Sequence, residues 1–276
     1  MKIAWPHGAR IAVALSFDVD AESTWLGRDP ENARRPGVLS QGTYSPKVAV
    51  PAILELLERE RVPATFFVPG LDADNHPDTV RAIHRAGHEV GHHGYEHVRA
   101  DPNDPAGEER SFMRAIESLT RLAVRPVGFR SPSWDFTEKT LELLKRERFA
   151  YSSNFMDDLY PYLHPGTQLV ELPVHWILDD APFFLFGLGV NQRPIQPASH
   201  ALEIWREEFE GLFELGGAPY VMTMHPQFIG RPSRLRALSE LVRFIKRHDG
   251  VWFATCRAIA DAARAQLSRP DPPPPA

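Results

Sequence analysis

The side chains with the clearest chemical potential are aspartates and histidines that come directly after short apolar runs. Asp18 and Asp20 follow the apolar run of residues 11–17, and His93 and His97 follow the third such run along the chain. Two imidazoles and one carboxylate form a zinc-type site that leaves positions open for water and substrate. The second carboxylate, Asp18, is then available as a general base toward water, whose pKa such an ion lowers.

Two further groups occupy comparable positions. Arg130 ends the fourth apolar run, where its guanidinium would orient Asp18 and keep it ionised. His225 ends the run of residues 220–224 and is the candidate general acid for a leaving group. Structural alternatives stay open: capping or salt-bridging aspartates, a surface salt bridge at Arg130, packing roles for the paired histidines, and a buried structural histidine at 225.

The segment from His93 to His97 also matches the zinc-protease pattern H-x-x-E-H. That motif belongs inside a regular helix, whereas Gly91 and Gly94 flank or interrupt it here and a strand leads directly into it. We therefore set the protease interpretation aside. The four-residue spacing still predicts a helical turn on which both imidazoles project the same way.

The elements that must position these residues alternate between strands and amphipathic helices. Strands are predicted at residues 11–17, 64–68, 89–91, 126–129, 169–173, 220–224 and 251–254. Helices are predicted at residues 46–59, 77–86, 108–122, 137–146, 201–215, 233–247 and 255–266. Seven such units favour a parallel α/β barrel over an open sheet, and the ends of parallel strands share one face, where active sites form.

Composition excludes several classes of protein. The 276 residues are 43% hydrophobic and 24% charged, which is typical of a globular chain and not of a disordered one. The net charge of −5 comes without a basic stripe, so we expect no nucleic-acid partner. One cysteine, Cys256, and the lack of a long apolar run predict a soluble cytoplasmic protein with no membrane association.

Three segments lack clear helix or strand patterns. Residues 21–44, rich in Gly, Pro and Arg, predict a long functional or mobile loop. Residues 182–188 are too apolar for an exposed loop, so we expect core, a subunit contact or a lid. Residues 1–267 are predicted to form one catalytic domain, and residues 268–276 a disordered proline-rich tail.

In this order, the motifs resemble those of the polysaccharide deacetylase family (carbohydrate esterase family 4, the chitooligosaccharide deacetylase homology domain). The matching segments are Ser16-Phe17-Asp18-Val19-Asp20, His93-x-x-x-His97, Arg130-Ser131-Pro132-Ser133-Trp134 and Met224-His225-Pro226. The residues of several motifs resemble those of a signal-less, cytoplasmic branch of the family, which includes a bacterial peptidoglycan deacetylase and cyclic-imide hydrolases. Similarity extends over roughly residues 8–262.

The resemblance implies a distorted (β/α)7 barrel and one divalent metal ion, Zn²⁺, held by Asp20, His93 and His97. It further implies Asp18 as base, Arg130 as its orienting partner and His225 as acid. A backbone N–H near Ser133 would help to hold the oxyanion. Trp134 and Trp176 are candidate walls of the substrate pocket, although each also suits the core.

This sequence departs from the family pattern at two places. Val19 separates two aspartates that are adjacent in secreted members, and no clear match exists for the Asp that tunes the acid histidine, for which Asp179 and Asp180 are both candidates. The resemblance implies a homo-oligomer, a dimer or tetramer, with a crowded barrel mouth. Deacetylation of an N-acetylated sugar and opening of a cyclic imide stay as alternative reactions, and a catalytically silent sugar- or amide-binding protein is the third.

Overall fold

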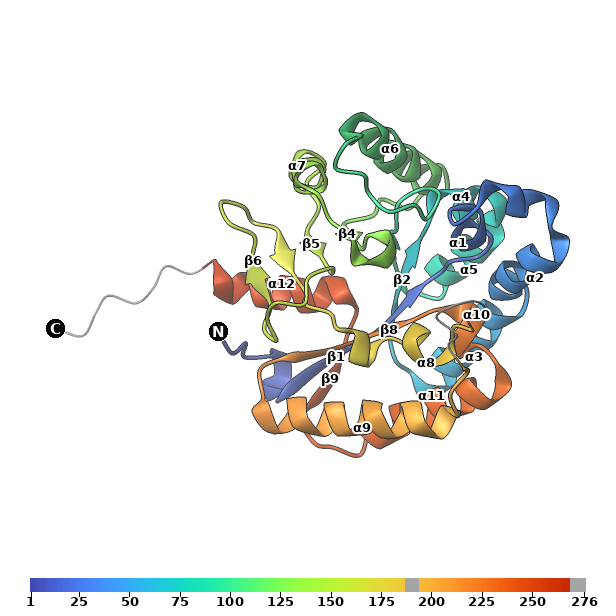
Figure 1. Ribbon diagram of the computed structural model, residues 1–276. Coiled ribbons are helices and arrows are strands. Elements are labelled where there is room, and N and C mark those ends of the chain that lie inside the picture. The colour runs from blue at the N-terminus through green and yellow to red at the C-terminus, as the bar shows by residue number, and fades with distance from the viewer. Residues whose placement is uncertain (187–193, 269–276) are drawn as a thin grey trace.

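A nine-stranded sheet forms the centre of the computed structural model, which describes residues 1–186 and 194–268 (Figure 1). The strands follow the order β6-β7-β5-β4-β3-β2-β1-β8, and β9 pairs with β1. All pairs are parallel except β6 with β7. The strands are β1 (Ile11–Asp18), β2 (Thr65–Val68), β3 (Glu89–His92), β4 (Gly128–Phe129), β5 (Tyr151–Ser152), β6 (Tyr162–Leu163), β7 (Val170–Glu171), β8 (Pro219–Met224) and β9 (Val251–Phe253).

Helices surround this sheet, and α9 packs beside α11 while α6 packs against α4 and α7 (Figure 1). The α-helices are α1 (Ser23–Leu26), α2 (Pro36–Tyr44), α3 (Val50–Glu60), α4 (Gly70–Asn75), α5 (Pro77–Arg85), α6 (Pro105–Arg121), α7 (Glu138–Arg146), α8 (Ala181–Phe184), α9 (Ala198–Leu215), α10 (Pro226–Ile229), α11 (Pro232–Ile245) and α12 (Cys256–Leu267). Short 3₁₀ or π turns are η1 (Pro6–Gly8), η2 (Pro30–Arg34), η3 (Ser45–Ala49), η4 (Pro132–Trp134) and η5 (Trp176–Leu178).

The long strand β1 shows how the sequence builds the barrel. Every residue of β1 is buried, as expected for a central parallel strand. Its large side chains, Ile11 to Phe17 at alternate positions, join the core beneath the outer helices. The small side chains between them, Ala12 and Ala14, join a second cluster with α12. Ser16, the next small residue on this second face, accepts a hydrogen bond from Arg130.

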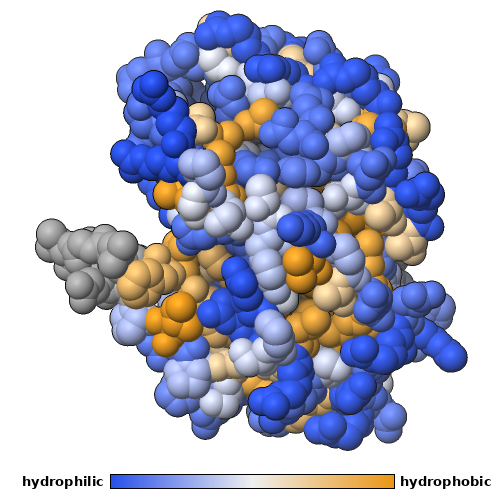
Figure 2. Space-filling model, turned by 90° about the vertical axis from the view of Figure 1, so that its right-hand side faces the viewer, coloured by the Kyte–Doolittle hydropathy of each residue, from blue (hydrophilic) through white to orange (hydrophobic). Residues whose placement is uncertain are grey.

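The predicted distorted barrel is confirmed, with an open seam, because no ladder joins β7 to β8 among the described residues. The predicted strands are all present, but β5 and β6 were not predicted. The predicted helices are also present, and Thr137 caps α7 by accepting a hydrogen bond from the Thr140 N–H. Hydrophilic residues cover most of the face in Figure 2, with hydrophobic residues in separate groups between them.

The prediction of a long loop at residues 21–44 is wrong, because this segment folds into α1, η2 and α2. Gly42 makes this packing possible, since a Cβ there would lie 2.3 Å from the Ala21 carbonyl oxygen. In the apolar segment 182–188, Phe184 is buried against Trp205, so this part belongs to the core. The rest of that segment after residue 186, and the tail after residue 268, lie outside the described residues.

Within the described ranges, no helix combines the length and the apolar character required to cross a membrane.

Candidate active site at the carboxyl ends of the strands

A cavity of about 100 Å³ lies at the carboxyl ends of β1, β3 and β8. It brings together every site residue predicted from the sequence except Arg130, which lies directly behind it: Asp18, Asp20, His93, His97, Ser133, Trp134, Trp176 and His225. These residues come from segments as far apart in the sequence as Asp18 and His225, and parallel strands carry them to one edge. The expectation of a shared face is therefore met.

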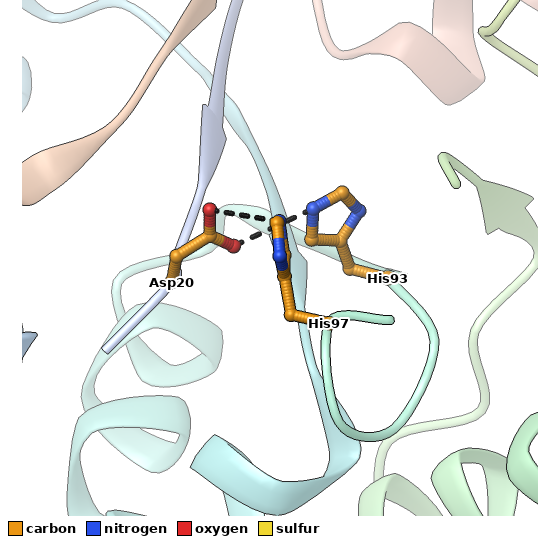
Figure 3. A group of neighbouring side chains, drawn as sticks. All are labelled: Asp20, His93 and His97. Carbon is orange, nitrogen blue, oxygen red and sulfur yellow. Dashed lines mark ion pairs between the residues drawn. The ribbon is translucent and has the colours of Figure 1, made fainter. Parts of the chain in front are cut away.

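The first group in the cavity is Asp20, His93 and His97, whose side chains converge from the end of β1 and the segment after β3 (Figure 3). The Nε2 atom of His93 lies 3.4 Å from Asp20 Oδ1, and that of His97 lies 3.1 Å from Asp20 Oδ2. Asp20 Oδ1 and His93 Nε2 are buried without a hydrogen-bond partner in the described structure. Unpartnered buried ligand atoms that face one another are what a cation-binding site requires, so these residues fit a zinc-type ion.

Protonation states agree with that fit. Burial opposes ionisation of Asp20, but the neighbouring imidazoles of His97 and His93 hold its pKa well below the ordinary range. Burial lowers the pKa of His93, which favours the neutral ring that can act as a ligand.

Hydrogen bonds on the far nitrogens orient both imidazoles. His93 Nδ1 lies 2.8 Å from the Arg130 carbonyl oxygen, to which it donates, and this leaves the Nε2 lone pair for a ligand bond. His97 Nδ1 lies 3.2 Å from the hydroxyl of Thr24, in α1. Thr24 was missed from the sequence, because it lies in the segment that was predicted to be a loop.

The predicted helical turn at His93–His97 is wrong. The residues after β3 form a loop, in which Gly94 and His97 both have left-handed backbones, with φ of 68° and 53°. A Cβ at Gly94 would lie 3.3 Å from the Pro132 ring, so the loop passes close to η4. The two imidazoles meet because this turn reverses direction, not because of helical periodicity.

Asp18 and Arg130 form a fully buried ion pair, with Arg130 Nη1 2.9 Å from Asp18 Oδ1. The same Nη1 donates to Ser16 Oγ at 2.8 Å, and Nη2 donates to Ser153 Oγ at 3.1 Å. The guanidinium also stacks over Phe67, 4.3 Å from the ring centroid. The predicted pairing of Asp18 with Arg130 is therefore present, and its serine partners are additions from the structure.

Beside the end of β1, His225 follows the neighbouring strand β8 and pairs with Asp180. His225 Nδ1 lies 2.7 Å from Asp180 Oδ1, whereas Asp179 Oδ1 is 3.7 Å away. The His225 backbone N–H also donates to Asp180, at 3.1 Å. Burial alone would lower the pKa of His225, but Asp180 and Asp179 raise it to about 10. Of the two aspartates that the sequence offers as partners of the acid histidine, Asp180 lies closer to His225.

The remaining predicted residues frame the mouth of the cavity. The rings of Trp134 and Trp176 lie 4.4 Å apart between centroids, with Trp134 buried and Trp176 44% exposed. Ser133 and Trp134 both have left-handed backbones, with φ of 57° and 56°, a conformation that non-glycine residues adopt at a cost. The Trp134 N–H is committed to the Ser131 carbonyl at 2.9 Å, which leaves the Ser133 N–H as the candidate oxyanion donor.

A second residue missed from the sequence, Asp72 in α4, fixes the chain directly after Asp20. Its buried carboxylate accepts hydrogen bonds from the Ala21 N–H at 3.0 Å, the Ser23 N–H at 3.2 Å and the Ser23 hydroxyl. Burial raises the pKa of Asp72 to about 7 against the effect of these donors. No local pattern signals this contact, because about fifty residues separate the partners.

The chain is similar to known proteins over almost its whole length. Residues 41–151 match the family model for polysaccharide deacetylase. The peptidoglycan deacetylase of Helicobacter pylori is 30% identical in an alignment of 280 positions, gaps included, that covers 91% of this chain and 95% of that protein. A Mycobacterium smegmatis crystal structure, provisionally assigned as a polysaccharide deacetylase, has a TM-score of 0.90 and 41% identity and covers 98% of both chains.

The crystal structure of Puue allantoinase is also similar, with a TM-score of 0.84 and 26% identity, covering 98% of this chain and 95% of that one. Proteins named as deacetylases therefore share sequence, and in the solved structure also fold, with more than nine-tenths of this chain. The chain belongs to the polysaccharide deacetylase family and is a hydrolase of carbon–nitrogen bonds.

Proposed function

We propose that this protein is a metal-dependent hydrolase of the non-peptide C–N bond of a small amide. The observation that carries the proposal is one cavity whose walls hold the Asp20/His93/His97 ligand set, Asp18 and His225. Arg130 pairs with Asp18 and Asp180 pairs with His225 from outside the cavity. Ligands, base and acid are the set required to hydrolyse an amide, and a protein that only binds its ligand has no use for all of them.

In this proposal Asp20, His93 and His97 hold one zinc-type ion. When bound there, such an ion supplies Lewis acidity toward a carbonyl oxygen and lowers the pKa of a water molecule. Asp18 takes the proton from the attacking water, and Arg130 holds the Asp18 carboxylate in place through the contact at 2.9 Å. The Ser133 N–H donates to the developing oxyanion.

His225 delivers a proton to the departing nitrogen. Because Nδ1–H donates to Asp180, the other ring nitrogen, Nε2, carries the proton that can be transferred. The raised pKa keeps His225 protonated at neutral pH, which suits a general acid and not a base.

The first candidate substrate is an N-acetylated sugar, which would lose its acetyl group. Membership of the deacetylase family and the H. pylori relative support it. The second candidate is a cyclic imide or other ring amide, supported by the full-length similarity to an allantoinase. A cavity of about 100 Å³ favours a small molecule over a long polymer in both cases.

Two exposed apolar side chains, Trp176 at the cavity and Phe186 after α8, also suit a homo-oligomer, as predicted from the resemblance.

One activity panel tests the proposal. The zinc-loaded protein, the chelator-treated protein and the variant Asp18→Asn are incubated with N-acetylglucosamine oligomers, succinimide and hydantoin. We expect turnover of at least one substrate, loss of it with chelator and recovery with zinc. Asp18→Asn should lose nearly all turnover, whereas the matched exposed variant Asp249→Asn should keep it. Activity in Asp18→Asn within about tenfold of the parent would remove Asp18 as the base.

A further inference from the structure

Three residues that line the cavity have a buried polar atom without a hydrogen-bond partner in the described structure. They are Asp20 with Oδ1, His93 with Nε2 and Gln227 with Oε1. The first two atoms belong to the ligand set for the metal ion. Gln227 has no part in that set or in the acid and base pairs, so its unpaired amide oxygen is unexplained. Buried polar atoms are nearly always paired, which indicates that the ligand supplies the partner.

The backbone of Gln227 is held beside the acid. Gln227 is the second residue of α10, two positions after His225, and only 4% of its surface is exposed. The backbone of α10 is tied to His225, because the Phe228 and Ile229 N–H groups donate to the His225 carbonyl at 2.8 and 2.9 Å. A Cβ at Gly230 would lie 2.4 Å from the Ala49 side chain, so α10 cannot easily shift. The backbone of Gln227 is therefore fixed beside His225 before any substrate arrives.

The chemistry of a carboxamide restricts what it pairs with best. Gln presents a donor and an acceptor side by side, as when it binds the edge of a nucleobase through two hydrogen bonds. The complementary partner is a cis amide, whose N–H and C=O point the same way. Ring amides, imides and ureides have that edge by construction. An open-chain secondary amide, such as the acetamido group of a sugar, is trans and has its N–H and C=O on opposite sides.

We propose that Gln227 is a specificity-determining residue that pairs with a second cis-amide edge of a ring substrate, beyond the bond that is cleaved. This inference rests on the proposed function, and it selects cyclic ureides and imides over acetylated sugars as the substrate class. The cavity of about 100 Å³ and the tryptophan pair at its mouth suit a small flat ring.

Hydantoin and 1-methylhydantoin test this pairing. The methyl group removes the N–H of the far edge and leaves the cleaved bond unchanged. We expect the parent enzyme to prefer hydantoin over 1-methylhydantoin by roughly 10- to 100-fold in kcat/KM, since the pairing with Gln227 consists of two hydrogen bonds. Gln227→Met should reduce that preference to within about threefold. The exposed, matched variant Gln41→Met should keep it.

Thermal melting and zinc binding of each variant show whether the fold and the ligand set are intact. If Gln227→Met melts early, Gln227→Leu makes the same comparison, because it also lacks the oxygen that would accept from the substrate N–H. An unchanged preference in a folded Gln227 variant would overturn the inference. So would turnover of N-acetylglucosamine oligomers with neither hydantoin cleaved, although the proposed hydrolysis would then stand. A zinc-loaded protein that cleaves no amide would overturn both.

Discussion

Removal of Arg130 alone from its buried pair with Asp18 should destabilise the protein more than removal of both partners. In Arg130→Met, the Asp18 carboxylate stays 3% exposed and loses the only side chain that donates to it in the described structure. An uncompensated buried charge of this kind costs about 3–5 kcal/mol of unfolding free energy. In Asp18→Asn, the guanidinium keeps its bonds to Ser16 and Ser153, so the loss should be about 1–3 kcal/mol.

The double variant carries neither charge, so its loss should be smaller than that of Arg130→Met alone. The resulting coupling energy should be about 2 kcal/mol or more. Urea denaturation at neutral pH, with chelator present in every sample, measures the four unfolding free energies. The exposed pair of Arg236 and Glu240 gives a matched cycle, Arg236→Met with Glu240→Gln, whose coupling should be close to zero.

Additive losses, with a coupling below about 0.5 kcal/mol, would refute the reasoning, because two buried charges in direct contact cannot act independently. A double variant less stable than Arg130→Met would refute it as well. Either result would mean that water solvates the Asp18 carboxylate or that another cation neutralises it.

Three further predictions concern the cavity itself. Asp180→Asn should lower the pKa of His225 from its raised value of about 10. Because a general acid must be protonated to act, kcat should then begin to fall at a lower pH than in the parent, and a pH–rate profile measures this shift. Thr24→Val should remove the contact at 3.2 Å that orients His97 and weaken zinc binding roughly tenfold in a competition titration, while an unchanged affinity would exclude the role. Trp176→Ala should raise KM roughly 3- to 10-fold with little change in kcat, and an equal fall in both would contradict a role in substrate binding.

Much of the site could be predicted from the sequence because its chemistry depends on strand ends. The run of residues 11–17 is long, apolar and rich in β-formers, so both its strand and the position of Asp18 and Asp20 at its end could be predicted. Arg130 and His225 followed from the same rule. Parallel strands present their carboxyl ends at one edge, so the positions of the strands were enough to bring these side chains together.

The features that the sequence did not reveal depend on contacts between distant segments. Strands β5 and β6 have two residues each, too few for any periodicity to appear. The segment from Ala21 to Gly42 folds into short helices because it packs against the rest of the barrel, and its own pattern does not predict them. Asp180, rather than Asp179, faces His225 because of the way the chain bends after η5. Gln227 stands in a segment, His225-Pro226-Gln227-Phe228, that resembles the cytoplasmic branch, but its proposed role follows only from its burial without a partner.

The central claim is that Asp20, His93 and His97 hold a metal ion, and metal analysis of the purified protein tests it most directly. The protein is purified without chelator, incubated with zinc, desalted and analysed by mass spectrometry for metals, beside Asp20→Ala and the matched exposed variant Asp249→Asn. We predict close to one zinc ion per chain in the parent and in Asp249→Asn, and a loss of most of it in Asp20→Ala. A folded parent without bound metal, or an Asp20→Ala variant with undiminished zinc, would contradict the account.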